Sequence, residues 1–464
     1  MSIYDTIIAN GTVVTPTLTA QMDLAIKDGK IAAIGKDLDS AENVIDATDC
    51  YVLPGGIDSH VHLAQPSGDG IVMADDFASG TLAALHGGNT MILSFCFQEK
   101  GGSLRQAVND YHARANDSCY CDVSFHLVVT DPTAQVLGQE LPSLVAAGYS
   151  SVKIFMTYEG LRLYDDEILS TLDAARSLNA TVMVHCENED AIRFLVEKHQ
   201  AANKLAPKYH ATTRPVAAER EATHRALALA EIVDVPIVIV HVSNEQAIEE
   251  IARARARSRN VVGETCPQYL FLTAEDLDGM DWEGAKFICS PPPRDKQAQE
   301  ACWQALQDGT FDLFSSDHCP FRYDDPAGKL NPKGRTNFKW VPNGIPGVET
   351  RLPLLFSEGV MKGRISLEQF VGLTSTNHAK TYGLYPRKGV LQLGSDADIA
   401  IWDPRIETVI TQQMLHHGAD YTPFEGFGVQ GWPTTVLLGG NTVIRERRQI
   451  EPKCLGNYIA RNVG

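Results

Sequence analysis

Short apolar segments alternate eight times with longer segments of helical periodicity between residues 52 and 319. This alternation predicts a parallel sheet, because a helix usually carries the chain back before the next parallel strand begins. Eight strand–helix units over roughly 250 residues are typical of a (β/α)8 barrel, or TIM barrel. A doubly wound open sheet is the competing fold. The expected strands are residues 52–63, 89–95, 122–129, 151–156, 181–185, 236–242, 260–264 and 311–317, and the expected helices include 76–85, 165–177, 187–200, 217–233 and 244–256.

The segments on either side of this repeat differ from it. Residues 1–51 contain short apolar runs separated by Asn10-Gly11 and Asp28-Gly29, which favour hairpin turns. Residues 389–464 are again β-like, with expected strands at 389–394, 397–402 and 435–438. Because chain termini often lie close together, we expect both segments to form one small β-sandwich domain. Residues 52–388 would then form the barrel with its loop insertions, including the Pro- and Gly-rich stretch 332–346 over the barrel mouth.

Composition excludes several classes of protein. An apolar fraction of 44% and a charged fraction of 21% indicate a soluble globular chain. The net charge of −18 disfavours binding to nucleic acid or to an anionic membrane. The 10 cysteines are scattered without zinc-finger spacing, so we expect reduced thiols. The N-terminus has no secretory signal pattern and no apolar run is long enough to span a membrane, which predicts a cytoplasmic protein.

Six polar residues interrupt expected strands that otherwise consist largely of Val, Ile and Met. His60 and His62 share one face of an extended chain, so both can bind one ion. A lone histidine at a strand end is most often a core residue with a hydrogen bond, and a lone lysine most often reaches water. In a barrel, however, all six side chains can meet at one rim, where four histidines and an aspartate suit zinc or a similar divalent ion. The six residues are His60, His62, Lys153, His185, His241 and Asp317.

Lys153 is the unusual member of this group, because a metal ion repels an ammonium group. The amine must therefore be neutral or modified. A neutral buried lysine can add carbon dioxide and become a carbamate, an anion whose two oxygens can bridge two metal ions. Together with Asp317, the carbamate would offset part of their charge and leave a site that still acidifies water.

In their local motifs, these residues resemble the amidohydrolase superfamily and, within it, the dihydropyrimidinase/D-hydantoinase branch of cyclic amidohydrolases. The likeness runs nearly end to end, and as a set the motifs are highly specific. They are His60-Val61-His62, Lys153, His185 in His-Cys-Glu-Asn, His241 in Val-His-Val-Ser, Asp317 in Ser-Asp-His-Cys, Asn10-Gly11, Gly394-Ser395-Asp396-Ala397-Asp398, Ser290-Pro291-Pro292 and Pro342-Asn343-Gly344-Ile345-Pro346-Gly347.

The resemblance implies a binuclear centre in which the four histidines and Asp317 bind two divalent ions, zinc or alternatively manganese, bridged by carbamylated Lys153. Asp317 would also act as general base toward a bridging hydroxide or water. Tyr158 matches the tyrosine that donates a hydrogen bond to the developing oxyanion. Ser290 and Asn343 match positions whose main-chain groups bind the cyclic substrate. Family members are commonly homotetramers, which implies the same assembly here.

The activity that the resemblance implies is hydrolysis of the ring amide of dihydropyrimidines (dihydrouracil, dihydrothymine) or 5-substituted hydantoins to N-carbamoyl amino acids. An allantoinase would share the metal ligands, and some relatives that have lost ligands serve as non-catalytic scaffold proteins. Dihydroorotases carry an arginine for the substrate carboxylate where this chain has Ala64, so a carboxylate on the ring is disfavoured. Residues 65–71 belong to a loop that shapes the exocyclic pocket in the family, and the preferred 5-substituent stays open.

Overall fold

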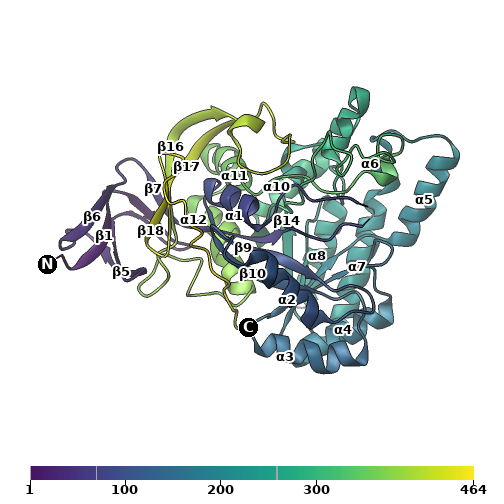
Figure 1. Cartoon of the computed structure of the whole chain (residues 1–464), viewed down its shortest axis with the longest axis horizontal. Coiled ribbons are helices and arrows are strands. Elements are labelled where there is room, and N and C mark those ends of the chain that lie inside the picture. The colour runs from purple at the N-terminus through teal and green to yellow at the C-terminus, as the bar shows by residue number, and fades with distance from the viewer. Residues whose placement is uncertain (1, 69, 258–259, 464) are drawn as a thin grey trace.

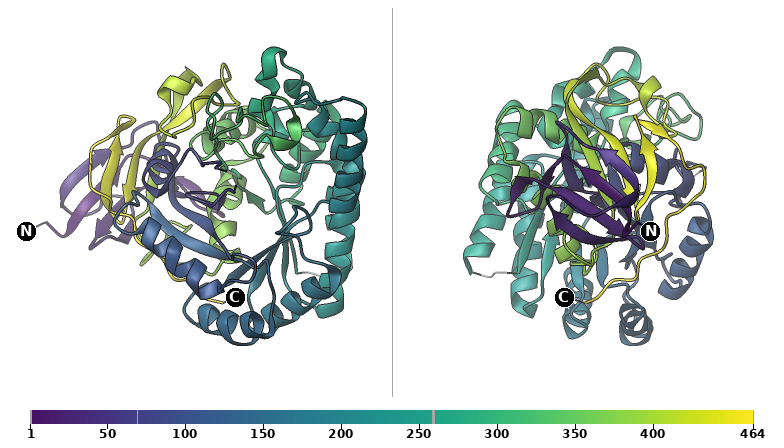
Figure 2. Two further views of the ribbon diagram at one scale, coloured as in Figure 1. Left: turned by 45° about the vertical axis from the view of Figure 1, so that its right-hand side comes forward. Right: turned by 90° about the vertical axis from the view of Figure 1, so that its left-hand side faces the viewer.

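Three sheets organise the computed structural model, which describes residues 2–68, 70–257 and 260–463 (Figure 1). Asp69 of the exocyclic-pocket loop lies outside the described residues. The largest unit is an eight-stranded parallel sheet in the order β15-β14-β13-β12-β11-β10-β9-β8. Its edges meet where Val61 forms a parallel bridge with His318, so the sheet closes into a barrel. The expected (β/α)8 barrel is confirmed, and the views in Figure 2 show its helices outside the strands.

The barrel strands are β8 (Gly56–Val61), β9 (Asn89–Phe97), β10 (Asp122–Val128), β11 (Ser151–Phe155), β12 (Thr181–His185), β13 (Ile237–Ile239), β14 (Val261–Thr265) and β15 (Leu313–Phe314). The α-helices are α1 (Phe77–His86), α2 (Leu104–Ala115), α3 (Leu141–Ala146), α4 (Asp165–Ser177), α5 (Glu189–Ala201), α6 (Tyr209–Thr213), α7 (Val216–Val233), α8 (Glu245–Arg257), α9 (Gln268–Phe271), α10 (Lys296–Gln307), α11 (Arg351–Leu355), α12 (Leu367–Val371) and α13 (Asn377–Thr381). Among the described residues, none of these helices is long and apolar enough to cross a membrane.

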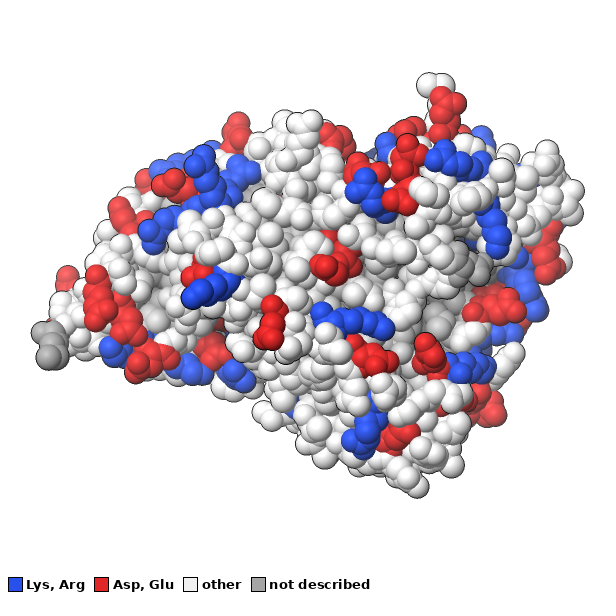
Figure 3. Space-filling view, viewed as in Figure 1, with Lys and Arg blue, Asp and Glu red and all other residues white. Residues whose placement is uncertain are grey.

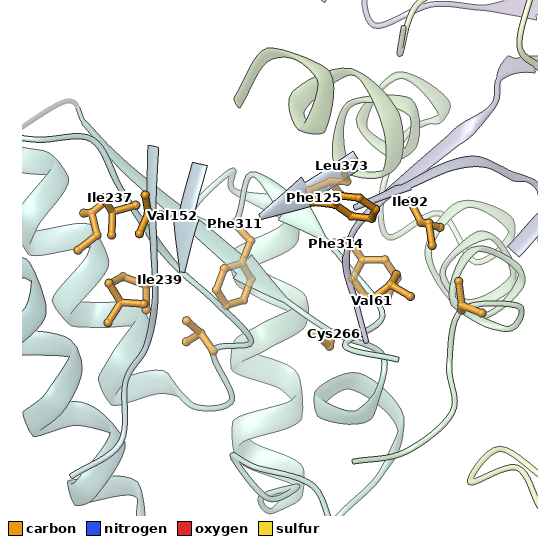
Figure 4. Packing of buried hydrophobic residues seen from close by; sticks show 14 of the residues in the cluster. Val61, Ile92, Phe125, Val152, Ile237, Ile239, Cys266, Phe311, Phe314 and Leu373 are labelled. Atoms are coloured by element: carbon orange, nitrogen blue, oxygen red, sulfur yellow. The ribbon is translucent and has the colours of Figure 1, made fainter. Parts of the chain in front are cut away.

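The two faces of the barrel strands bury different side chains. In β9, Met91 and Leu93 belong to the cluster that fills the barrel interior, whereas Ile92 packs with the outer cluster. Figure 4 shows Ile92, Val152 and Ile237 among the buried side chains of that outer cluster. This alternation follows from the period of two along a strand, and it decides which strand residues can reach the barrel mouth.

Two strand predictions were wrong. Residues 52–63 form two strands in different sheets, because the chain breaks after Pro54 and Gly55 N donates to the Asp398 carbonyl oxygen. Residues 389–394 form turns instead of a strand, since Gly389 and Gly394 both adopt positive φ, at 80° and 86°. Helices α2, α3 and α10 follow barrel strands as the repeat requires, although no bounds were predicted for them.

The terminal segments form the expected sandwich of two sheets that share an apolar core. One sheet has the order β5-β4-β1-β6 and the other the order β19-β18-β17-β16-β7-β2-β3. The strands are β1 (Tyr4–Ala9), β2 (Thr12–Val14), β3 (Thr19–Gln21), β4 (Asp23–Lys27), β5 (Lys30–Gly35), β6 (Ala41–Asp46), β7 (Tyr51–Pro54), β16 (Ile399–Val409), β17 (Gly428–Leu438), β18 (Asn441–Arg445) and β19 (Arg448–Gln449).

Acidic and basic side chains intermingle over the molecular face drawn in Figure 3.

A buried lysine ties the sandwich to the barrel. Lys388 Nζ lies 2.5 Å from a carboxylate oxygen of Asp122, at the start of β10, and 2.5 Å from one of Asp398, just before β16. Asp396 adds a third carboxylate at 2.9 Å. Lys388 is buried, and these carboxylates raise its pKa above the ordinary value although burial opposes the charge. The ammonium group therefore joins two sheets that are remote in sequence.

We expect Lys388→Met to destabilise the protein by about 3–5 kcal/mol, because the change leaves buried carboxylates without their counter-ion. Urea unfolding followed by circular dichroism measures the loss. Lys36→Met, on the exposed surface of the sandwich, is the matched control and should change the midpoint little. Equal midpoints for the two variants would contradict this role of Lys388.

Candidate metal centre

Strand alternation directs Lys153 and His185 into the barrel. In β11, Val152 and Ile154 belong to the outer cluster, so Lys153 between them faces inward. In β12, Val182 and Val184 likewise face outward, which turns His185 toward the interior at the end of the strand. The carboxyl ends of parallel barrel strands form one rim, where enzymes of this fold place their active sites.

His60, His62 and Asp317 converge at this rim. His60 Nε2 lies 3.3 Å and His62 Nε2 3.4 Å from the same oxygen of Asp317. All three side chains are buried, and their ligand atoms lie within 4.8 Å of one another. Asp317 follows β15 with φ of 49°, a left-handed backbone that turns its carboxylate away from the regular strand direction. The neighbouring His60 and His62 imidazoles lower the pKa of Asp317 although burial opposes this.

A second pair of imidazoles lies beside the first group. His185 Nδ1 and His241 Nε2 are 2.9 Å apart, and the rings of His60 and His241 have centroids 5.4 Å apart. Burial lowers the pKa of His60, His185 and His241, so these rings are neutral at neutral pH. Neutral imidazole is the form that binds metal ions.

Lys153 is completely buried between the two groups. Its Nζ lies 5.4 Å from the ring centroid of Phe95 and 5.2 Å from that of Phe155. Among the described residues, this nitrogen has no hydrogen-bond partner, a costly arrangement for an amine. Burial lowers the pKa of Lys153 to about 8, although Glu264 and Asp317 oppose the shift. The neutral amine is therefore accessible near neutral pH.

All nine residues expected in the site line one cavity of about 460 Å³. Tyr158 comes from the loop after β11, and hydrogen bonds with Ser290 and Asn343 partly offset the effect of burial, which raises the pKa of Tyr158 to about 12. The structure thus brings Tyr158, Ser290 and Asn343 together beside the histidines. The ligand-type residues in this lining are His60, His62, Lys153, His185, His241 and Asp317.

Lys329 fixes the two loops that carry Ser290 and Asn343. Its buried Nζ donates to the carbonyl oxygens of Ile288, at 2.9 Å, and Pro342, at 3.1 Å. The adjacent Gly344 has φ of 142°, and a Cβ atom there would lie 2.3 Å from the Cys319 carbonyl oxygen. Only glycine allows this close approach, so the loop after Asn343 is held against the segment that follows Asp317.

Comparison with known proteins decides the family, because the profile of the amidohydrolase family matches residues 51–443. This chain belongs to the amidohydrolase family. It is 47% identical over 458 residues to a D-hydantoinase of Rhizobium radiobacter, covering 98% of this chain and 99% of that protein. A D-hydantoinase of Geobacillus stearothermophilus is also 47% identical, with 98% and 96% covered. The crystal structure of a dihydropyrimidinase from Brevibacillus agri NCHU1002 matches with a TM-score of 0.96 and 44% identity over 99% of both chains. The resemblance expected from the motifs is confirmed.

The donor set of this amidohydrolase suits divalent cations of the zinc type. Imidazole and carboxylate ligands bind such ions, and beside them lies the Lys153 amine, which has no hydrogen-bond partner within residues 2–68, 70–257 and 260–463. Another group of ligand-type side chains, His86, Glu349 and His416, lies elsewhere. The rings of His86 and His416 stack with centroids 3.4 Å apart and planes 9° apart, so one ion cannot lie in both ring planes.

Three residues that were not among the predicted site residues form hydrogen bonds with the histidines on the side away from the cavity. Glu264 accepts from His60 Nδ1 at 2.7 Å, and Gln65 lies 2.7 Å from His62 Nδ1. Glu187 lies 2.8 Å from His185 Nε2. Each contact fixes one ring nitrogen and leaves the other directed at the cavity. Glu264 could have been found, since it is a charged residue at the end of an expected strand.

Because Glu264 orients His60, we expect Glu264→Gln to weaken metal binding by about 10- to 100-fold. Competition with a chelator, followed by metal analysis of the protein, measures the affinity. Glu140→Gln is the control, since Glu140 is a buried carboxylate that accepts hydrogen bonds from Ser103 and Arg105 away from the cavity. Unchanged affinity in the Glu264 variant would show that this hydrogen bond does not support the centre.

Proposed function

We propose that this protein hydrolyses the ring amide of dihydropyrimidines or 5-substituted hydantoins to N-carbamoyl amino acids. The observation that carries the proposal is the meeting of six ligand-type residues with Tyr158, Ser290 and Asn343 in one cavity. The names of the relatives, D-hydantoinase and dihydropyrimidinase, agree with it. The protein would act on a small cyclic molecule, as a cytoplasmic homotetramer.

We propose that two divalent ions, zinc or alternatively manganese, bind between these ligands. His60 and His62 would hold one ion, His185 and His241 the other, and Asp317 would complete the set. Lys153 would bridge the two as a carbamate, a role supported by its burial, its lowered pKa and the absence of another partner among the described residues. When bound, the ions would acidify a water molecule and polarise the ring carbonyl group.

The protein's own residues would then move the proton and stabilise the developing charge. Asp317 would take the proton of the attacking water and hand it to the leaving ring nitrogen, acting first as base and then as acid. The Tyr158 hydroxyl would donate a hydrogen bond to the carbonyl oxygen as it becomes an oxyanion. Main-chain groups at Ser290 and Asn343 would pair with the ring's own N–H and C=O groups and orient it.

Part of the remaining cavity wall favours an apolar 5-substituent. Phe97, Phe155, Leu161 and Ile71 supply aromatic and aliphatic surface, beside the polar residues Gln65, Ser67 and Lys339. Ala64 offers no cation at the position where dihydroorotases carry the arginine for the ring carboxylate. An allantoinase activity would place the polar ureido group of allantoin against this apolar wall, and so it is the second candidate. A scaffold role without catalysis would leave the complete ligand set unexplained.

The metal-loaded protein should hydrolyse hydantoin, phenylhydantoin and dihydrouracil, and turn them over about tenfold or more faster than allantoin, because a polar substituent loses its water against an apolar wall. Protein with two equivalents of zinc or manganese is assayed by the appearance of N-carbamoyl products, with metal analysis on the same sample. If none of the three substrates reacts in metal-loaded protein, the proposed activity is wrong. Faster turnover of allantoin would favour the second candidate.

The variant Lys153→Ala should lose most bound metal and more than about 100-fold in kcat/KM, since even the partners of metal ligands contribute 10- to 100-fold. Added acetate or propionate should restore part of both, because a small carboxylate can replace the bridge. Lys36→Ala, on the exposed surface, is the control. Full metal content in Lys153→Ala would exclude a bridging role for this residue.

A further inference from the structure

Arg214 is a buried arginine beside the cavity. It follows α6 and precedes Pro215 at the start of α7, and its side chain is 8% exposed. Its Nη1 donates to Glu187 Oε2 at 2.7 Å. Its guanidinium carbon lies 5.4 Å from the ring centroid of Tyr158. A desolvated guanidinium at this distance attracts the electron-rich face of an aromatic ring.

Glu187 connects this arginine to the candidate metal centre. The oxygen that accepts from Arg214 also lies 2.8 Å from His185 Nε2. The rings of His185 and Tyr158 have centroids 5.3 Å apart and are inclined by 61°. One buried carboxylate oxygen therefore fixes both the imidazole and the guanidinium that lie beside the tyrosine ring.

The backbone of Tyr158 is held separately from its ring. Tyr158 has φ of 72°, in the left-handed region. Its N–H donates to Glu189 Oε2 at 2.9 Å, and the Thr157 hydroxyl donates to the same oxygen at 2.7 Å. These bonds fix where the side chain starts, but they leave its two torsion angles free. The direction of the hydroxyl depends on its hydrogen bonds with Ser290 and Asn343 and on the side chains packed around the ring.

We propose that Arg214 is a positioning residue for the hydrolysis, holding the Tyr158 ring so that its hydroxyl faces the substrate carbonyl oxygen, while Glu187 holds the guanidinium in place. This inference rests on the proposed function. The positive charge at the ring also draws electron density from the phenol, so its O–H becomes a stronger donor. Because negative charge on the carbonyl oxygen develops only in the transition state, Arg214 should affect kcat far more than KM.

The arrangement requires arginine in particular. A planar guanidinium can lie against a ring and donate to a carboxylate at the same time, whereas an ammonium group offers a point charge on a flexible stem. Arg214→Lys should therefore keep the ion pair with Glu187 and the fold, yet lose much of the positioning of Tyr158.

A double-mutant cycle in the metal-loaded full-length enzyme tests the proposal. Wild type, Arg214→Met, Tyr158→Phe and the double variant are compared with a hydantoin that the wild type hydrolyses. Arg214→Met should lower kcat by about 10- to 100-fold with little change in KM. In the Tyr158→Phe background the same change should cost less than about threefold, because the hydroxyl that Arg214 positions is already absent. Equal losses in both backgrounds would overturn the proposal.

Two further measurements separate positioning from other roles. Metal content should stay at the wild-type level in Arg214→Met. Loss of metal would show that the arginine acts through Glu187 on His185 and not on Tyr158, and would overturn the proposal. Should Arg214→Met not fold, because Glu187 is left unpaired, Arg214→Lys replaces it in the same cycle with the same expectation. Failure of the proposed function is distinguishable, since the wild type would then hydrolyse none of the cyclic amides.

Arg461→Met is the matched control for the loss of a buried arginine. Arg461 is 3% exposed and donates to Ser124 Oγ and Ser151 Oγ, each at 2.8 Å, and among the described residues it makes no hydrogen bond or ring contact with Tyr158. Its removal should lower the Tm, and its effect on kcat should be the same in the Tyr and Phe backgrounds. A coupling to Tyr158 as large as that of Arg214 would show that the cycle reports general destabilisation, and would overturn the proposal.

Discussion

The Lys153 amine is buried without a hydrogen-bond partner in the part of the chain that the structure describes, and this is the strongest physical constraint on the candidate centre. A strand interior can accommodate a long side chain, but an amine that loses its water needs compensation. The neighbouring groups are aromatic rings, imidazoles that burial keeps neutral, and the carboxylates of Glu264 and Asp317. Burial outweighs the two carboxylates and lowers the pKa of the amine to about 8, which is the property that the proposed carbamate requires.

The rest of the fold keeps these groups in position. The seam between β8 and β15 brings Asp317 against His60 and His62, because Val61 bridges to His318 and His62 N donates to the His318 carbonyl oxygen at 2.7 Å. Behind the rim, hydrogen-bonded carboxylates fix the outer nitrogen of His60 and of His185. The candidate metal ligands are thus held by the strands of the barrel, whereas loops supply the other walls of the cavity.

The sequence was sufficient to predict the features that follow from the local spacing of apolar residues, namely the barrel strands and the polar residues that interrupt them. Eight apolar runs predicted the barrel, and charged or imidazole side chains within such runs predicted the candidate ligands that now line one cavity. It was insufficient where tertiary contacts decide: residues 52–63 read as one apolar run, yet Pro54 and Gly55 divide it between two sheets. Glu264 stands visibly at the end of an expected strand, but its contact with His60, 204 residues away, exists only when the strands have closed. Arg214 lies outside every expected strand and helix. Glu187, two residues after His185, was close enough to be suspected.

The buried charged groups of this barrel are of two kinds, those already paired with an opposite charge and those without such a partner among the described residues. Arg214 and Glu187 neutralise each other at 2.7 Å, so this pair is complete without any bound group and serves to hold neighbouring rings. Lys153, by contrast, has no such partner among the described residues, and Asp317 lies beside the imidazoles of His60 and His62. A self-sufficient ion pair therefore lies behind the candidate centre, where the buried amine has no carboxylate of the described residues at hydrogen-bond distance. Removing the Arg214–Glu187 pair should disturb the position of the Tyr158 ring, whereas removing the Lys153 amine should disturb metal binding. The two effects therefore distinguish the supporting ion pair from the candidate centre.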